Sequence, residues 1–391
     1  MGWKFNLSLQ AAVCLTQNRS VGNTLPTLDY IPGSTLRGLL AKNYLDQPGR
    51  SVDTQFQNLF LSEDICYPNL YPQGARVIPL SALTCKYHPG FGTDNKAHGA
   101  VDGVLPWLRD LLTNKAQLEP SADYCGVESC RAPLDRLSGY YIINDNREEQ
   151  QVAVRKRLMA RTAILESREV VKPGALYTLE VLEEEQEFAG EVSAPDNIIQ
   201  QLQEFIASHL HGWIGTARSR GLGKVKLSMD EENDDRCYPM AERLSGFNRK
   251  LHGDGRMSCF SLTLESDAIV LDELLGYRSR PLISDLQMAA STPEAEILNN
   301  FELLAAWTRV QRVTGWQAAW KLPKPEEQAI RRGSVFVYGL RNGGQTLIDN
   351  QANSLVAFLT QLEEKGLGER PTEGFGRLRV CDEFHWENER K

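Results

Sequence analysis

The sequence has no apolar run long enough to cross a membrane and no apolar leader. Its first residues, MGWKF, lack the basic stretch and apolar segment of a secretory signal. No window approaches about 18 uninterrupted apolar residues. We therefore expect a cytoplasmic protein that does not contact a membrane. In such a reducing compartment, the eight cysteines of the chain indicate free thiols or metal ligands and not disulfides.

Positive charge is also scarce, because 43 lysines and arginines stand against 51 acids and the formal net charge is -8. This balance argues against a protein that coats nucleic acid with its whole surface, although recognition depends on local patches. Acid is absent from residues 209–226 (HLHGWIGTARSRGLGKVK), where glycines and cations gather. Glycine permits positive φ and close backbone approach, and arginine offers a planar fork for phosphate oxygens. The segment predicts an anion-binding loop, with a basic surface turn as the alternative.

Apolar periodicity predicts an α+β fold with two halves of like order. The elements expected in the first half are a strand at 5–13, a helix at 34–45, strands at 140–143 and 175–182, a helix at 197–210 and a strand after residue 224. Those expected in the second half are strands at 257–264, 309–319 and 334–340 and helices at 294–306 and 354–362. In both halves a helix, a glycine loop and a last strand follow one another. Residues 374–379 (GFGRLR) align with residues 221–226 (GLGKVK).

We interpret this order as a duplicated βαββαβ unit, the ferredoxin-like or RRM-like arrangement. The first domain is predicted to span residues 1–229 and the second residues 256–391, with an acidic, polar linker at 230–255. Residues 61–136, approximately, differ in texture, with prolines, glycines and most of the clustered cysteine and histidine. This region is predicted to be an insertion in the first domain.

The repetition of the glycine loop favours a phosphate-binding role over a plain turn. A dinucleotide site is disfavoured because these glycines follow a helix and precede a strand, the reverse of the dinucleotide-binding order. Residues 33–38 (GSTLRG) lack the lysine of a nucleotide P-loop. The predicted phosphate contacts are Arg218, Arg220, Gly221, Gly223 and Lys224 in the first loop, Arg370, Gly374, Gly376 and Arg377 in the second, and Arg37, Lys42 and Arg161 elsewhere.

Four residues of the insertion have the chemistry of a zinc site. Cys85 and His88 form one pair, and Cys125 and Cys130 form another. Thiolates and imidazole bind zinc in tetrahedral sites, and a complete set of four leaves no open position, so the predicted zinc is structural. His98 is a competing ligand. Buried cysteines that only pack are the alternative.

Two parts of the sequence together resemble the RAMP superfamily of CRISPR effector subunits: residues 30–38 (YIPGSTLRG) and the glycine-rich loop before the last strand. The segments that are similar to the Csx-ten family of type III-D subunits are residues 27–34 (TLDYIPGS), 85–91 (CKYHPGF), 315–323 (GWQAAWKLP) and 373–377 (EGFGR). The resemblance spans nearly the whole chain. It implies a tandem RAMP protein in an RNA-guided antiviral complex. Such subunits hold guide RNA and target RNA beside other effector subunits.

The resemblance also raises an enzymatic alternative, an endoribonuclease. It offers Asp29 as a residue that cuts target RNA, although the catalytic aspartates of related subunits lie farther upstream. A carboxylate near the scissile phosphate orients the 2′-hydroxyl or holds a metal ion, whereas a turn aspartate is the structural alternative. His209 and His211 are candidate bases for guide-precursor processing, or complements to a helix end. We favour a non-catalytic, RNA-binding subunit, in which Trp213, Trp316 and Trp320 fill the core or stack on bases.

Overall fold

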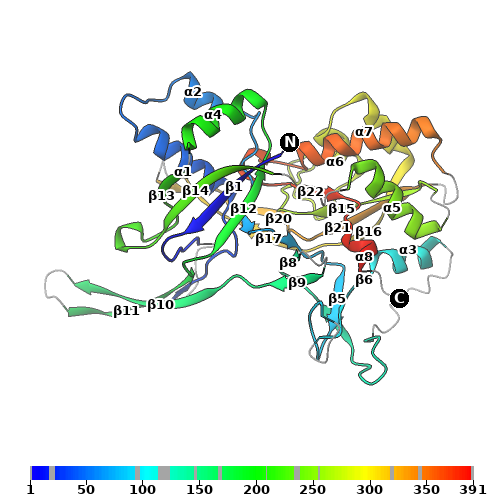
Figure 1. Ribbon diagram of the computed structural model, residues 1–391, viewed down its shortest axis with the longest axis horizontal. Coiled ribbons are helices and arrows are strands. Elements are labelled where there is room, and N and C mark those ends of the chain that lie inside the picture. The colour runs from blue at the N-terminus through cyan, green and yellow to red at the C-terminus, as the bar shows by residue number, and fades with distance from the viewer. Residues whose placement is uncertain are drawn as a thin grey trace.

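The computed structural model describes residues 2–16, 23–92, 97–112, 124–144, 148–165, 170–207, 209–232, 238–253, 256–317, 321–341 and 346–388, without the side chains of residues 163–175 and 232. Trp320 therefore lies outside the described residues. The fold is mixed α+β, and each half of the chain forms one larger antiparallel sheet. Figure 1 shows these two parts side by side. The predicted α+β class is confirmed.

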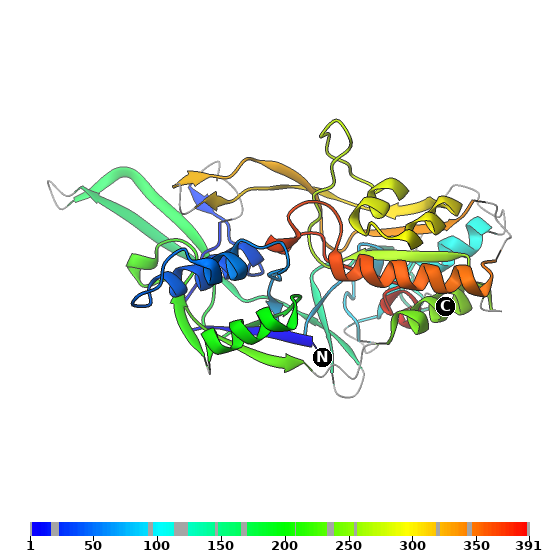
Figure 2. The same ribbon diagram turned by 90° about the horizontal axis from the view of Figure 1, so that it is seen from above.

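The sheet of the first half has five strands in the order β13-β14-β1-β12-β3. These strands are β1 (Gly2–Leu9), β3 (Tyr71–Pro72), β12 (Glu187–Val192), β13 (Leu210–Trp213) and β14 (Lys224–Glu232). The helices α1 (Gly33–Leu45), α2 (Thr54–Phe60) and α4 (Asp196–Ile206) cover one face. The helices pack on this face because apolar side chains alternate along β1: Phe5, Leu7 and Leu9 are buried, whereas the residues between them are not. Figure 2 shows the helices on one side of this sheet only.

The sheet of the second half has four strands in the order β16-β21-β15-β22. They are β15 (Cys259–Leu264), β16 (Phe301–Trp307), β21 (Val335–Leu340) and β22 (Leu378–Val380). The helices of this half are α5 (Met240–His252), α6 (Ile283–Ala289), η2 (Pro293–Asn300), α7 (Asp349–Lys365) and α8 (Phe384–Glu387). All six residues of β15 are buried, so this sheet is covered on both faces. In both sheets the last strand pairs with the first, and the first pairs with the strand before the final long helix.

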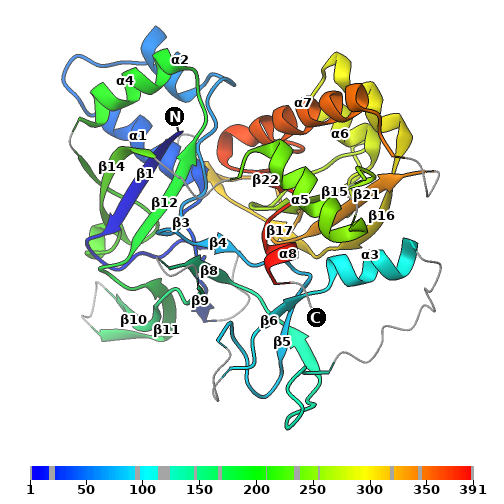
Figure 3. The same cartoon turned by 45° about the vertical axis from the view of Figure 1, so that its right-hand side comes forward.

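The region predicted as an insertion forms two small sheets and a helix. Its elements are β4 (Arg76–Val77), β5 (Ala82–Cys85), β6 (Ala100–Asp102), α3 (Val104–Leu112) and β7 (Leu134–Arg136), and β8 (Tyr140–Ile143) and β9 (Glu149–Val152) follow. The helix α3 buries Val104, Leu105 and Leu108 in the core of the second half. Figure 3 shows α3 beside α8. This region therefore packs on both halves and not on the first alone.

A long two-stranded hairpin leaves the body of the first half. It consists of β10 (Lys156–Leu165) and β11 (Val170–Leu182), and the short β2 (Thr24–Leu25) pairs in parallel with β11. Figures 1 and 2 both show it extending away from the two larger sheets. Short pieces complete the fold: β17 (Val310–Val313), β18 (Trp316–Gln317), β19 (Leu322–Pro323), β20 (Glu327–Ile330), η1 (Arg218–Arg220) and η3 (Pro371–Glu373).

The helix α5 lies within residues 230–255, where the sequence predicted a linker. Its Leu244, Phe247 and Leu251 are buried in the second core. The sequence of this helix looks polar although the helix is packed, because two of its buried residues, Arg243 and Asn248, are polar. Arg243 forms an ion pair with Glu363, and the Asn248 amide donates a hydrogen bond to the Cys259 carbonyl. Of the remaining predicted linker, residues 233–237 and 254–255 lie outside the described residues.

The helix predicted at 294–306 is wrong in its second half, since Phe301–Trp307 form the strand β16. Pairing with β21 overrides the helical propensity of its leucines and alanines. Among the described residues, no helix is both long enough and apolar enough to cross a membrane.

Candidate nucleic-acid interface

The first glycine loop joins β13 to β14 and crosses over another backbone segment. The turn η1 lies between Ala217, at φ 56, and Gly221, at φ 84, which are both left-handed. Gly223 has φ 86, and a Cβ placed there would collide with the Ile214 carbonyl oxygen. Its N–H donates to the Ala12 carbonyl at 2.8 Å. Glycine is therefore required at position 223 by the crossing of two chain segments, and its N–H is committed inside the protein.

The cations of this loop face solvent. Arg218, Arg220 and Lys224 are exposed. Among the described residues, no acid forms an ion pair with any of these three side chains. Arg220 Nη1 donates to the Tyr177 hydroxyl at 2.6 Å. The loop thus presents two guanidinium groups and an ammonium group for a phosphate to bind.

Tyr177 connects this loop to the middle of the hairpin. It lies on β11 directly opposite Arg161 on β10, so these two side chains share one face of the hairpin. Tyr177 also packs, with Met159, against the cluster that contains Leu222 of the loop. Arg161 is half-buried, and no ion pair joins it to any residue in the part of the chain that is described. The structure thus brings the predicted residues Arg161 and Arg220 to the same tyrosine, a neighbourhood that sequence spacing does not predict.

The second glycine loop repeats the backbone of the first. Five backbone hydrogen bonds of the first loop have counterparts in the second. In the first loop the N–H groups of Ile214, Thr216, Gly223, Arg220 and Gly221 donate to the carbonyls of Gly223, Cys14, Ala12, Ala217 and Arg218, respectively. In the second loop, in the same order, the N–H groups of Leu367, Glu369, Gly376, Glu373 and Gly374 donate to the carbonyls of Gly376, Ile269, Asp267, Arg370 and Pro371. Arg370 and Gly374 are left-handed, like their counterparts Ala217 and Gly221. The backbone therefore adopts one loop conformation twice.

The side chains of the second loop serve a different purpose. Glu373 stands where the first loop has Arg220, and three cations converge on its half-buried carboxylate: Arg37 at 2.9 Å, Lys324 at 2.7 Å and Arg370. We call these four residues the clasp. Although burial alone would raise it, hydrogen bonds from Lys324 and Arg370 lower the pKa of the Glu373 carboxyl to about 2. Arg37 and Arg370, both predicted to bind phosphate, are therefore neutralised within the protein.

The second loop also covers the start of α1. The Asn69 amide donates to the Gly374 carbonyl at 3.1 Å, and its Oδ1 accepts from the Gly33 N–H at 2.9 Å. A Cβ on Gly33 would approach the Glu373 carbonyl oxygen to 2.8 Å. Arg377 reaches Glu191 on β12, with 3.6 Å between Nη2 and Oε2. The second loop is thus an intramolecular contact between the two halves.

Two other predicted residues are also engaged. Lys42 pairs with Asp46 at 2.7 Å on the exposed side of α1, and such exposed pairs contribute little to stability. Asp29 accepts from Arg332 Nη2 at 2.6 Å, and the Arg332 guanidinium lies 4.6 Å from the centre of the Tyr30 ring. Arg332 has 10% of its side chain exposed. The carboxylate of Asp29 therefore joins the first half to a buried arginine of the second.

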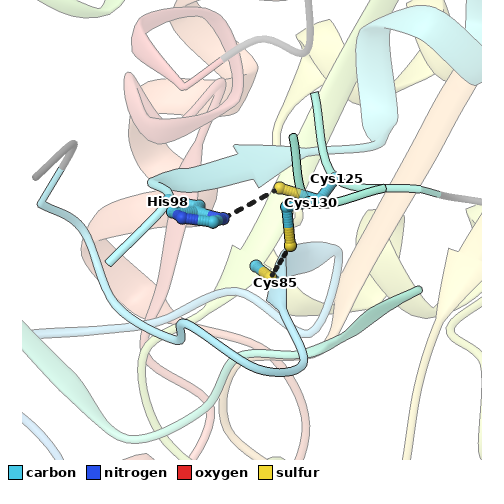
Figure 4. A group of neighbouring side chains, drawn as sticks. All are labelled: Cys85, His98, Cys125 and Cys130. Carbon is cyan, nitrogen blue, oxygen red and sulfur yellow. Dashed lines mark hydrogen bonds between the residues drawn. The ribbon is translucent and has the colours of Figure 1, made fainter. Parts of the chain in front are cut away.

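Three cysteine side chains and one histidine side chain from the region predicted as an insertion converge, as Figure 4 shows. The ligand atoms of Cys85, His98, Cys125 and Cys130 all lie within 4.8 Å of one another. Cys85 Sγ is 3.7 Å from Cys130 Sγ, and His98 Nδ1 is 3.2 Å from Cys125 Sγ. Although burial opposes it, N–H groups of His88 and Tyr87 lower the pKa of the Cys85 thiol. Three thiols and one imidazole at this spacing fit the donor set that zinc takes.

His98 takes the place that the sequence assigned to His88. The two segments pair, since the His98 N–H donates to the His88 carbonyl at 3.0 Å, and the two rings stack at 4.2 Å. The His88 ring therefore lies behind the His98 ring and not among the thiols. Spacing alone did not separate the two histidines, because both lie in the chain between β5 and β6.

The described fold and its sites define a mixed α+β protein with antiparallel sheets and a cationic loop on one side. A model of the RAMP superfamily matches residues 16–226. This match covers more than half of the chain, so the protein belongs to the RAMP superfamily. No curated protein sequence matches the chain.

Solved structures of low sequence identity are similar to it. A chain in a cryo-EM structure of the type III-B Cmr-beta complex bound to cognate target RNA and AMPPnP has 13% identity over 85% of this chain and 86% of its own, with a TM-score of 0.43. A chain in the same kind of complex bound to cognate target RNA has 14% identity over 97% and 99%, with a TM-score of 0.41. A Cas6 product complex has 13% identity over 51% and 80%, with a TM-score of 0.33.

Proposed function

We propose that the protein is an RNA-binding structural subunit of a CRISPR type III-D effector complex of the Csx-ten kind. One observation carries this proposal. The two glycine loops have the same backbone conformation. The charged side chains of the second loop form ion pairs within the protein, whereas the first loop presents Arg218, Arg220 and Lys224 to solvent. In a chain of net charge -8, such a patch has the chemistry of a phosphate-backbone contact. Guide RNA and target RNA are the proposed ligands, and other effector subunits are the proposed protein partners in the cytoplasm.

In this proposal the first loop and the hairpin hold consecutive phosphates. Arg218 and Arg220 each offer a guanidinium fork, and Arg161 extends the positive surface along the hairpin. Tyr177 fixes Arg220 through its hydroxyl, which lowers the entropy cost of holding the guanidinium in place. Gly221 supports the patch by its conformation, since no heavy atom lies within 4 Å of where its Cβ would be. The outer side of the turn is therefore open to a bulky ligand.

The two halves are proposed to be ferredoxin-like RAMP domains, at residues 1–229 and 256–391. The shared strand order supports this. In the first sheet β1 lies between β14 and β12, and in the second sheet β15 lies between β22 and β21, so in each sheet the first strand is flanked by the last strand and by the strand before the final long helix. The packing of α5 in the second core supports including residues 240–252 in the second domain. The region from about 61 to 136 is proposed to be a zinc-stabilised insertion that bridges both domains.

The zinc is proposed to be structural, with Cys85, His98, Cys125 and Cys130 as its ligands. The apolar cluster around these residues contains little besides the cysteines, Ala132 and Leu134. Such a small core supplies little folding free energy, whereas a metal bound by four ligands supplies much of it. Four protein ligands leave no position for a substrate.

The RNA-binding proposal is tested by replacing Arg218, Arg220 and Lys224 together with alanine. A matched control replaces Arg249, Lys250 and Arg312, which are exposed cations of the second half, so both variants lose the same charge. Binding of single-stranded RNA is measured by fluorescence anisotropy at several salt concentrations. We expect weaker binding for the loop variant alone, with a salt slope smaller by about 2, since each phosphate contact contributes about 0.7. Equal affinities and slopes for the two variants would refute the proposal.

A further inference from the structure

The first sheet leaves one face open, whereas the second sheet is covered on both. Along β1 the residues Lys4, Asn6 and Ser8 point away from the helices and are half-buried, between fully buried neighbours. The residues opposite them on β14 are Asp230, Ser228 and Lys226. Lys224 is two residues before Lys226 on this strand and therefore lies on the same face. Figure 2 shows the helices on the opposite side. Solvent therefore reaches a continuous polar face made by β13, β14, β1 and β12.

An exposed tryptophan stands at one edge of this face. Trp213 on β13 has 53% of its surface exposed, although burying an indole stabilises a fold by a few kcal/mol. In the register of the sheet, Trp213 lies opposite Lys224, and His211 lies opposite Lys226. Residues directly opposite in an antiparallel pair share a face. An aromatic ring, an imidazole and two ammonium groups thus line one strip, which begins at the cationic loop.

The other end of this strip leads into a shallow hollow of about 240 Å³. Asn6, Lys226, Ser228 and Asp230 are among its lining residues. The Asn6 amide donates to Asp230 Oδ2 at 2.5 Å, and the Ser228 hydroxyl donates to the same oxygen at 3.3 Å. Within the described part of the chain, no hydrogen-bond donor reaches Asn6 Oδ1, which is buried. An unpaired buried acceptor costs free energy, so the hollow favours a ligand that donates hydrogen bonds.

We propose that this face binds unpaired nucleotides of single-stranded RNA. Trp213 stacks on one base, Lys224 and Lys226 hold the phosphates between bases, and the hollow receives the edge of another base. Strands are about 4.8 Å apart and residues rise about 3.3 Å, so the indole and the hollow are separated by roughly 16 Å, the reach of two to three nucleotides. The proposal rests on the RNA-binding role argued above and names the form of RNA that the protein takes.

The hollow also indicates which base it prefers. Asn6 Oδ1 and the carboxylate of Asp230 are two neighbouring acceptors, and Lys226 is a donor beside them. Guanine matches this set, because its N1–H and its amino group donate while O6 accepts. A duplex presents neither its base faces nor this edge, so the site selects unpaired RNA.

The experiment compares the native full chain with the variants Trp213→Ala and Trp213→Phe and with the control Tyr277→Ala, whose tyrosine is 43% exposed in the second half. Each is titrated with a fluorescent single-stranded RNA, with the same RNA carrying abasic sites, and with a duplex. For Trp213→Ala we expect about tenfold weaker binding to intact single strands. The abasic RNA and the duplex should bind as they do to the native chain, and Trp213→Phe should keep most of the affinity. Tyr277→Ala should resemble the native chain.

The outcomes separate this inference from the RNA-binding proposal. Equal binding of intact single strands by Trp213→Ala and the native chain, with the Arg218, Arg220 and Lys224 variant still impaired, would overturn the inference alone. No RNA binding by the native chain would overturn both. A second arm replaces guanine by other bases in the RNA. The native chain should lose affinity while Asp230→Asn should not, and equal affinity of the native chain for all four bases would overturn the role of the hollow.

Discussion

Arg220 and Glu373 occupy the same position in two loops of the same backbone conformation, and they carry opposite charges. The Arg220 guanidinium donates to Tyr177 and faces solvent, whereas the Glu373 carboxylate receives three cations. This exchange separates a loop that holds the two halves together from a loop that remains free to bind a ligand.

Replacing Glu373 with glutamine should destabilise the protein and change how its stability depends on pH. The pKa of this carboxyl is about 2 in the folded chain, against an ordinary value near 4.3. Stability from the clasp is therefore fully present above about pH 4.3 and is lost as pH falls toward 2. Burial lowers the pKa of Lys324 despite its ion pair with Glu373. This cost of burying the ammonium group offsets part of the stability that the clasp contributes. We expect a loss on the order of 2 kcal/mol at pH 7.

Urea unfolding between pH 3 and pH 7 measures this effect. The Glu373→Gln variant should lose less stability than the native chain as pH falls below about 4.3. Glu326→Gln is the matched control, because its pair with Arg312 is 3.9 Å long and exposed. Parallel stability curves for the native chain and Glu373→Gln would show that the clasp contributes nothing.

The proposed zinc site predicts different results for two neighbouring histidines. His98→Ala removes a proposed ligand, and we expect zinc affinity to fall by more than about 100-fold, since even outer partners of a ligand contribute 10- to 100-fold. His88→Ala removes a ring that only stacks on His98, so zinc should stay bound. Metal analysis and thermal melting with and without a chelator measure both variants. Full zinc content in His98→Ala would exclude this ligand set. A native chain whose melting temperature is unchanged by a chelator would exclude it as well.

Asp29 should act in stability and not in cutting. Asp29→Ala leaves the nearly buried guanidinium of Arg332 without its acid, which we expect to cost about 2 kcal/mol, below the 3–5 kcal/mol of fully buried pairs. A double-mutant cycle with Arg332→Met measures the coupling by urea unfolding. In parallel, target RNA cleavage is compared between effector complexes that contain the native chain or Asp29→Asn. Loss of a single cut with Asp29→Asn, at unchanged stability, would favour the endoribonuclease alternative.

Two glycines of the first loop should differ in their tolerance of alanine. Gly223→Ala places a methyl group against the Ile214 carbonyl oxygen, which we expect to cost 3 kcal/mol or more because the backbone must move. Gly221→Ala meets no atom within 4 Å and keeps only the cost of positive φ, roughly 1 kcal/mol. Thermal melting of the two variants tests this, and equal losses would contradict the crossing geometry.

Periodicity predicted the elements whose burial follows a single face. The strand β1, the helices α1 and α4, and the carboxyl-terminal α7 lie near their predicted positions because their apolar residues recur at strand or helix spacing. The helix α5 was missed because Arg243 and Asn248 are buried with partners. A composition-based reading treats such residues as surface.

The residues of the candidate site were predictable from the sequence, but their ion-pair and hydrogen-bond partners were not. Aligning the two loops already places Glu373 opposite Arg220, which is a signal that the sequence contains. The partners of Glu373 come from distant segments, since Arg37 and Lys324 belong to α1 and to the chain beyond β19. Only tertiary structure brings them together. The same holds for Tyr177, which is joined to Arg220 by a fold that spacing does not encode.

The attachment of the hairpin to the first loop has a mechanical consequence. β10 and β11 contact the body through Met159, Tyr177 and Leu179, and β10 continues for four residues beyond Arg161, which lies opposite Tyr177. At about 3.3 Å per residue this outer part is roughly 13 Å long, so a rotation of about 5° at Tyr177 displaces its end by roughly 1 Å. A ligand that moves Arg220 would therefore also shift the outer part of the hairpin, which lies beyond the reach of the loop itself.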